Sequence, residues 1–181
     1  MARKKDNSRM IMDIILMLMA VAVLITLFIP MLKYTGTLLG RSSTTSMVGT
    51  DNIGSIFASD ASGLTGGGKA LYSLLQGDES AFVTGAYGWC YFVTMIAAAG
   101  CLVFSLLDIL HIRLGLLNKI CALVLGLGSI VTMIFGFIVP GKMTSISIGG
   151  LAGVSGSVAF GLFLLIAGIV YAILYMYQER R

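Results

Sequence analysis

Four long apolar stretches limit the folds open to this chain of 181 residues more than any other feature. A helix needs about 20 consecutive apolar residues to cross the hydrocarbon core of a bilayer, which is roughly 30 Å thick. All four stretches meet this length, so we expect membrane-spanning helices at about residues 10–32, 86–110, 116–139 and 157–177. The predicted fold class is an all-α membrane protein, a four-transmembrane-helix bundle in which residues 1–181 form a single integral membrane domain.

The composition supports this prediction and argues against a nucleic acid partner. Only 11% of the residues are charged and 57% are hydrophobic, whereas soluble domains average about 25% charged residues. The formal net charge is +4 at pH 7. The basic residues flank the apolar stretches instead of forming a stripe on a soluble face, so they are expected to contact the headgroups of the lipid bilayer.

Lysine and arginine residues also determine the orientation that we expect. Eight of the twelve lie in three short segments, namely the two tails and the turn between the second and third stretches. These eight are Arg3, Lys4, Lys5, Arg9, Arg113, Lys119, Arg180 and Arg181. Because positive charges favour the cytoplasmic side, both termini are expected in the cytoplasm of a multi-pass protein of the plasma (cell) membrane. Two loops, about 33–85 and 140–156, would then face outward.

Both outer loops carry patterns of regular structure. In the first loop, alanine and leucines at helical spacing, followed by a glycine, predict a short helix over residues 69–76. In the second loop, Ile146 and Ile148 alternate with serines, which predicts a strand over 143–148. Such a strand could pair with one from the first loop and so satisfy its backbone groups. We therefore expect a small extracellular α+β cap, made of a short helix and a few strands.

Prolines and aromatic residues mark the expected boundaries of the membrane. Pro30 and Pro140 stand at the outward ends of the first and third stretches and are predicted to end those helices, because proline lacks an N–H and disfavours helix in the residue before it. Tyrosine and tryptophan favour the interfaces. The expected outer belt is Tyr34, Tyr87, Trp89 and Tyr91, and the expected inner belt is Tyr171, Tyr175 and Tyr177.

Pairs of small residues four positions apart are the candidates for helix packing. In lipid, close approach of backbones is a principal source of helix association, and small side chains permit it. The pairs are Ala97 and Cys101, Ala122 and Gly126, Gly149 and Gly153, and Ala152 and Gly156. The sequence leaves open whether these faces meet within one bundle or between subunits of a homo-oligomer.

Charged and titratable residues gather near the expected inner interface. The cluster comprises Asp13, Asp108, His111, Arg113 and Lys119. Asp108 and His111 lie on one helical face and would form a pH-responsive pair next to Arg113. The plainer alternative pairs Asp108 with Arg113 or Lys119 and leaves the imidazole among headgroups. For Asp13, Arg9 lies four residues earlier and is close enough to pair.

The sequence offers no constellation for catalysis, cofactor binding or metal binding. His111 is the only histidine, and none of the three cysteines belongs to a Cys-x-x-Cys motif. We therefore expect no catalytic residues, no cofactor and no metal, and we do not expect an enzyme. The centres of the four stretches also lack the ionisable groups that an ion-coupled transporter normally needs near the membrane midplane.

In the order of its elements, the chain resembles the claudin-type four-span layout. The shared features are four spans with cytoplasmic ends, a long first outer loop that finishes in a short helix, and a strand in the second outer loop. The claudin signature of a tryptophan followed by two cysteines is absent from the first loop, since Trp89 and Cys90 stand at the head of the second span. The chain also resembles small uncharacterised four-span bacterial proteins, whose first and third spans end in a similar Phe-x-Pro stretch.

These observations lead to two hypotheses of function. The first is a non-enzymatic tetraspan membrane protein that acts by lateral assembly, or by binding a membrane-protein partner, through its outer loops. The alternative is a subunit of an oligomeric channel or pore. Thr94, Ser105, Ser129 and Thr132 would line the pore, although such residues more commonly form hydrogen bonds with the backbone.

Overall fold

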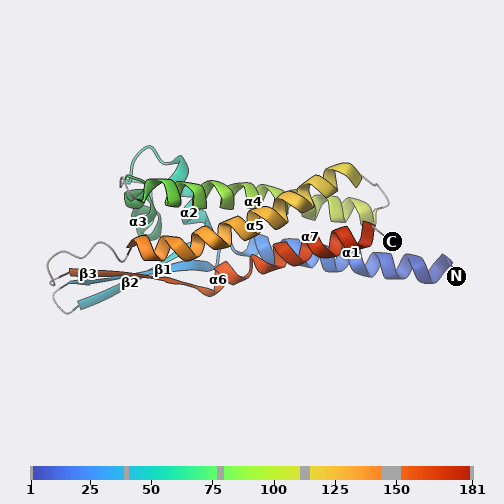
Figure 1. Cartoon of the computed structure of the whole chain (residues 1–181), viewed down its shortest axis with the longest axis horizontal. Coiled ribbons are helices and arrows are strands. Elements are labelled where there is room, and N and C mark those ends of the chain that lie inside the picture. Colours follow the sequence, from blue (N-terminus) through green and yellow to red (C-terminus); the bar gives the residue numbers. More distant parts are fainter. Residues whose placement is uncertain (1, 39–40, 77–79, 111–114, 144–151, 180–181) are drawn as a thin grey trace. The chain divides into compact units, whose positions relative to one another are not determined.

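A computed structural model describes residues 2–38, 41–76, 80–110, 115–143 and 152–179 of the chain (Figure 1). The elements in chain order are α1 (Ala2–Ile25), β1 (Pro30–Leu38), β2 (Arg41–Val48), α2 (Gly49–Phe57), α3 (Gly66–Leu75), α4 (Ala81–Ile109), α5 (Gly115–Met143), β3 (Ala152–Val158), α6 (Phe160–Phe163) and α7 (Ile166–Glu179). They form two compact units. Unit 1 comprises Met1–Ile25, Val93–Ile130 and Leu164–Arg181, and unit 2 comprises Thr26–Phe92 and Val131–Phe163.

Three helical stretches in the described ranges are long and apolar enough to cross a membrane. They are Ala81–Ile109, Gly115–Lys142 and Phe160–Gln178. The helices α4 and α5 have 29 residues each, so each is about 43 Å long at 1.5 Å per residue. The predicted second, third and fourth apolar helices are therefore confirmed, except that the last begins at Phe160 and not at Ser157, which belongs to β3.

The prediction of a first helix over residues 10–32 is wrong at its outward end. The helix α1 ends at Ile25, and its apolar part, Met10–Ile25, is shorter than the other three stretches. A turn follows, and strand β1 begins at Pro30. The physical reason is that Pro30 restricts the residue before it to extended backbone, and the apolar residues after it are buried in a strand instead of a span.

Unit 2 contains a three-stranded antiparallel sheet with the order β2-β1-β3 (Figure 1). In the central strand, Thr35 pairs with Thr44 of β2 on one side and with Ser155 of β3 on the other. Pro30 stands at the first position of β1, next to an irregularity in the register with β2. It precedes the first residue that pairs with β3, so its missing N–H removes no bond from that side.

Two short helices of unit 2 follow the strand β2. The predicted helix over 69–76 is confirmed as α3, whose N-cap Thr65 accepts a hydrogen bond from the Gly68 backbone N–H at 3.2 Å. The helix α2 was not predicted from the sequence. It begins directly after β2, where the Thr50 backbone N–H donates to the Leu27 carbonyl at 3.1 Å.

The second outer loop also departs from the predictions. A strand of this loop does pair with a strand near the first loop, but it is β3, and residues 144–148 of the predicted strand lie outside the described residues. Ala152, Gly153 and Gly156, proposed as helix-packing residues, are in β3 and not in a helix. Pro140 does not end the third span, since α5 continues to Met143. Only the last turn follows this proline, so few helical bonds are affected.

Small residues bring the helices of unit 1 close together. A Cβ atom added at Gly126 of α5 would lie 2.6 Å from Ala172 Cβ of α7, and one at Gly168 of α7 would overlap the Ser129 hydroxyl and lie 3.2 Å from Ser129 Cβ. The backbones of α5 and α7 can approach this closely only because these positions lack side chains. The helices α1 and α7 also pack side by side in this unit (Figure 1).

The predicted aromatic belts are wrong for several tyrosines. Tyr87 and Tyr91 are fully buried in unit 2, where the Tyr87 hydroxyl lies 3.8 Å from Met31 Sδ and the Tyr91 hydroxyl lies 3.0 Å from Thr26 Oγ1. Tyr171 and Tyr175 are buried in unit 1, whereas Tyr177 is exposed. Hydropathy shows that these rings lie near the ends of apolar helices, but it does not show which side of the helix faces the interior.

We predict that Gly168→Ala destabilises the protein by about 1–3 kcal/mol, because the added methyl group overpacks the contact with Ser129. The matched control is Gly141→Ala, where an added Cβ would meet nothing within 4 Å. That substitution should be neutral or stabilise the helix by up to about 1 kcal/mol. Thermal unfolding in mild detergent measures both. Equal effects at the two positions would contradict the packing described for α5 and α7.

Candidate functional site

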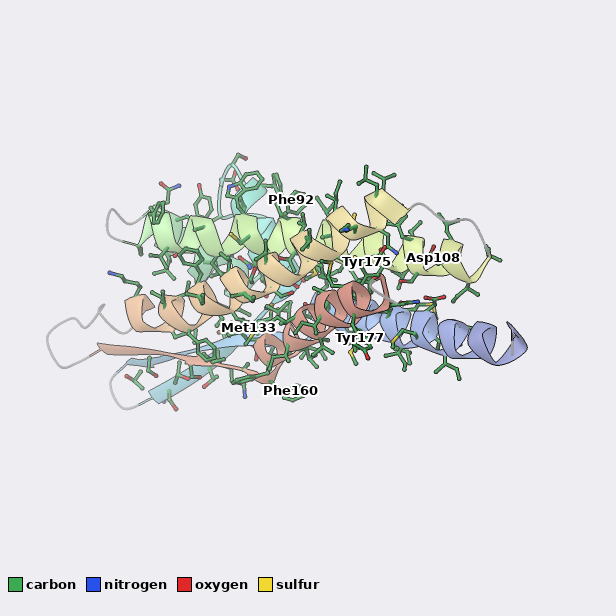
Figure 2. All side chains as sticks on the ribbon, turned by 45° about the vertical axis from the view of Figure 1, so that its right-hand side comes forward. Phe92, Asp108, Met133, Phe160, Tyr175 and Tyr177 are labelled. Atoms are coloured by element: carbon green, nitrogen blue, oxygen red, sulfur yellow. The ribbon has the colours of Figure 1, made fainter. Side chains whose placement is uncertain are left out.

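A hydrogen-bonded polar network lies inside unit 1, although its helices are apolar. Asn118 of α5 donates from Nδ2 to Asp108 Oδ2 of α4 at 3.0 Å, and its Oδ1 accepts from the hydroxyl of Tyr171 in α7 at 3.4 Å. The Tyr171 hydroxyl also lies 3.0 Å from Ser105 Oγ. We call Ser105, Asp108, Asn118 and Tyr171 the polar network; Figure 2 labels Asp108.

The polar network joins three helices through groups that are costly to leave unpaired. Asn118, Tyr171 and Ser105 are all buried, and an unpaired buried polar group costs about 1–3 kcal/mol. The amide of Asn118 uses both its donor and its acceptor, which a residue with one polar function cannot do. Tyr175, labelled in Figure 2, stacks on Tyr171 with ring centroids 6.3 Å apart. The network therefore fixes the rotation of α4, α5 and α7 about their axes.

A second carboxylate of unit 1 pairs across the sequence. Asp13 of α1 is buried and accepts a hydrogen bond from Gln178 Nε2 of α7 at 2.9 Å. A charged acceptor strengthens such a bond relative to a neutral one. This contact ties the helix that begins the chain to the helix that ends it. The predicted partner Arg9 has a side chain outside the described part, so that pairing stays a prediction.

Of the predicted charge cluster, the structure describes the side chains of Asp13, Asp108 and Lys119. His111 and Arg113 lie outside the described residues, so both the Asp108–His111 pair and the Asp108–Arg113 pair stay predictions. Lys119 is half-buried on α5, next to the buried Asn118. Sequence reasoning missed Asn118 because it considered ionisable groups. The available signal was an amide at the start of an apolar stretch, a position where a polar side chain needs a partner.

The predicted helix-packing residues have different environments. Ala97, Cys101 and Ala122 are buried, and Gly126 meets Ala172 of α7. Gly149 lies outside the described residues. The contacts found for these positions are within the chain, which leaves their contribution to contacts between subunits untested.

Asp51 connects β2, α2 and α3 of unit 2 through hydrogen bonds of its carboxylate. Its Oδ2 accepts a hydrogen bond from the Val48 backbone N–H at 3.0 Å, and its Oδ1 accepts one from the Thr65 hydroxyl. Thr65 in turn caps α3. A Cβ at Gly67 would lie 2.8 Å from Asp51 Oδ2, so only glycine fits there without displacement. Asp51 thus links the end of β2 to the first turns of α2 and α3. This role of Asp51 was not predicted from the sequence, because a capping box normally has serine or threonine at the N-cap, and the N-cap of α2 is Val48.

The sheet of unit 2 presents two edge strands, β2 and β3. The side chains of Arg41, Ser42, Ser43 and Thr44 are all exposed in β2. Charged residues and proline usually protect such edges. Here β3 has the sequence AGVSGSV with neither, and the only charge in β2 is at its first residue, Arg41.

The described ranges contain no group of three or more histidine, cysteine, aspartate or glutamate side chains that could hold a metal ion. Cys90, Cys101 and Cys121 form no disulfide. Comparison of the chain with protein-family models, with curated proteins and with solved structures found no match. The resemblance to the claudin-type layout therefore stays a prediction.

We predict that Tyr171→Phe lowers the free energy of unfolding by about 0.5–1.5 kcal/mol, because it removes the hydroxyl that links Ser105 to Asn118. Tyr34→Phe, at a half-buried position of β1, is the matched control. Adding Ser105→Ala to Tyr171→Phe should cost less than the sum of the two single substitutions, because the partners share one bond. Unfolding in detergent measures all four variants, and full additivity would contradict the network.

Proposed function

We propose that this chain is a non-enzymatic four-span protein of the cell membrane that acts by lateral assembly with a second copy of itself. Three helical stretches long enough to cross a membrane support the membrane location. In this proposal, α1 is the fourth span and the residues after Ile25 complete its crossing. The gathering of lysine and arginine in the two tails and around residues 111–119 supports cytoplasmic termini.

The open edge of the sheet is the observation on which assembly depends. The backbone N–H and C=O groups along the outer side of β2 have no partner strand in the described part of the chain. Such a row of groups is a template for another strand. Because β2 carries one charge in eight residues and no proline, pairing of its first residues with a second β2 strand meets little electrostatic resistance. The start of α3 packs against its last residues, from Thr45 to Met47, so the exposed part from Arg41 to Thr44 is the part open to pairing.

Antiparallel pairing of β2 with β2 would be self-complementary and would close as a symmetric dimer. We favour the β2 edge over the β3 edge because β3 contains Gly153 and Gly156, and glycine weakens strands. Main-chain hydrogen bonds would supply the affinity, as in other cases of strand addition. The two sheets would then form one continuous sheet shared by the copies.

The channel alternative has less support. Thr94, Ser105, Ser129 and Thr132 were its candidate pore-lining residues, and each is at most 2% exposed. Side chains buried in this way are directed to the interior of one chain, so they are not available to a path between subunits. Support for an enzyme would require a nucleophile with an adjacent base or a metal ligand set, and the polar network of unit 1 supplies neither.

We predict that proline at one of the two neighbouring positions Ser42 and Ser43 weakens assembly while leaving the monomer folded. Backbone groups of adjacent residues in a strand point to opposite sides, so one of these N–H groups faces β1 and the other faces outward. The outward-facing substitution should weaken dimerisation at least about tenfold, which corresponds to ~1.4 kcal/mol. The inward-facing one should lower the unfolding temperature instead.

Cross-linking in vesicles at graded protein-to-lipid ratios measures dimerisation, and thermal unfolding reports on the fold. A wild-type chain that is monomeric at every ratio, or two proline variants that both dimerise like the wild type, would contradict the assembly proposal.

We also predict that both termini lie in the cytoplasm and that the turn around Ser62, which is exposed in unit 2, lies outside. A fluorescent protein that folds only in the cytoplasm should report at either terminus. A phosphatase that is active only outside should report when inserted at Ser62. If the two termini report from opposite sides of the membrane, the chain crosses it an odd number of times, and the four-span proposal is contradicted.

A further inference from the structure

One face of the sheet in unit 2 presents hydroxyl side chains and a single charge. Side chains alternate between the two faces along a strand, so Lys33 and Thr35 of β1 point to the same side. Their direct partners point there as well, because paired residues of antiparallel strands share a face. Two rows result. We call Ser46, Lys33 and Ser157 the lysine row, and Thr44, Thr35 and Ser155 the threonine row.

The opposite face of this sheet is covered, whereas the two rows are open. The helices α2 and α3 pack against β2, and Leu32 and Met47, which point to the opposite side, are buried. A Cβ at Gly66 of α3 would lie 3.3 Å from Thr45 Cγ2 on that same side. In the two rows, five of the six side chains are exposed and Thr35 is half-buried. Both rows are therefore accessible to a ligand in the described part of unit 2.

The lysine row has the donors that a phosphate group needs. Ser46 and Ser157 stand directly opposite Lys33 on its two sides, and neighbouring strands lie about 4.8 Å apart. An ammonium group offers three donors and each hydroxyl offers one. Neither row contains an acidic side chain, so the negative charge of a ligand meets no repulsion from these residues. Hydrogen bonds between charged partners are also stronger than neutral ones. The lysine row therefore suits an anion with several acceptor oxygens.

The threonine row offers a different kind of contact, two residues farther along the sheet and about 7 Å from the lysine row. The hydroxyls of Thr35 and Thr44 lie 3.0 Å apart and share a hydrogen bond. The second hydroxyl proton and several lone pairs of this couple remain for a ligand. Ser155 adds a third hydroxyl on the other side of Thr35. Groups that both donate and accept match the hydroxyls of a polyol.

Large apolar rings are exposed beyond the other end of the lysine row. Phe28 is 75% exposed and Phe160 is 69% exposed, and both belong to unit 2. Phe160, labelled in Figure 2, follows three residues after Ser157. The Ala159 backbone N–H donates to the Met31 carbonyl at 2.8 Å, which holds this end of β3 beside the start of β1. The surface therefore changes from apolar to hydroxyl-bearing along one sheet, with the lysine row between the two parts.

We propose that the lysine row binds the phosphate of a membrane phospholipid with a polyol headgroup, such as phosphatidylglycerol, and that the threonine row binds the hydroxyls of this headgroup. The inference rests on the proposed membrane location of the chain. A lipid fits better than a soluble phosphate ester, because Phe28 and Phe160 present apolar surface next to the phosphate, where the acyl chains begin. Pairing of β2 edges leaves this face open, since side chains stand roughly perpendicular to the sheet.

Binding of short-chain lipids to the full chain in neutral detergent tests the inference, with native mass spectrometry as the measurement. The lipids are dihexanoyl phosphatidylglycerol, phosphatidic acid and phosphatidylcholine, and soluble glycerol 3-phosphate is the competitor. Lys33→Gln removes the charge of the lysine row. Lys69→Gln is the matched control, since Lys69 is an exposed lysine of α3 in the same unit. Thr35→Val tests the threonine row, and thermal unfolding verifies that every variant is folded.

We expect the wild type to bind phosphatidylglycerol more tightly than phosphatidic acid, although the phosphate monoester of phosphatidic acid carries at least as much negative charge. Phosphatidylcholine should bind most weakly. Lys33→Gln should weaken phosphatidylglycerol binding at least about tenfold, as expected for a lost charge-assisted hydrogen bond, and Lys69→Gln less than about twofold. Thr35→Val should remove the preference for phosphatidylglycerol over phosphatidic acid. Glycerol 3-phosphate should not displace the lipid.

Three results would contradict the inference. Equal losses for Lys33→Gln and Lys69→Gln would mean that charge alone attracts the lipid. Displacement by glycerol 3-phosphate at the lipid's own concentration would identify a soluble phosphate ester as the ligand. A preference for phosphatidylglycerol that survives in Thr35→Val would remove the role of the threonine row. Each of these results in protein that resists aqueous washes of the membranes leaves the proposed function intact, whereas protein recovered in those washes would contradict the proposed function itself.

Discussion

The early end of α1 is the constraint on which the rest of unit 2 depends. Once the helix stops at Ile25, the backbone groups that follow need partners, and Pro30 disfavours helical backbone at the residue before it. The central position of β1 supplies partners on both sides. Two further bonds close the ends of this segment, from Thr50 N–H to the Leu27 carbonyl and from Ala159 N–H to the Met31 carbonyl. The sheet, α2 and the start of α6 are therefore all arranged around one short segment.

In unit 1, the hydrophobic effect contributes little to the association of the apolar helices if lipid surrounds them, so other interactions have to hold the helices together. Close packing at Gly126 and Gly168 provides contact, and the Asn118 amide provides direction, because it satisfies groups on two other helices. Helices held by packing alone can slide along or rotate against one another. A buried amide with two fixed hydrogen-bond partners prevents both movements, so packing and the Asn118 hydrogen bonds together specify one arrangement of α4, α5 and α7.

The sequence predicted the elements whose pattern is local. The apolar helices α4, α5 and α7 follow from hydropathy, and α3 follows from the helical spacing of its alanine and leucines and the glycine after them. It failed where partners are distant or the solvent is unknown. The bond between Asp13 and Gln178 joins residues 165 positions apart, and Met31 and Leu32 are equally suited to a span or a buried strand.

If the protein is confined to a membrane, pairing through the unprotected edge of β2 is sufficient for assembly. In solution, an edge without charges or proline is a hazard, because it can meet other chains in any orientation. In the proposed four-span protein, β1 begins at Pro30, a few residues after the span α1 ends at Ile25, and β2 pairs with β1, so the chain would keep β2 close to the outer surface of the bilayer. Every copy would then present the same edge at the same height. That restriction raises the effective concentration of matching edges, so the lack of protection along β2 becomes a means of selective pairing.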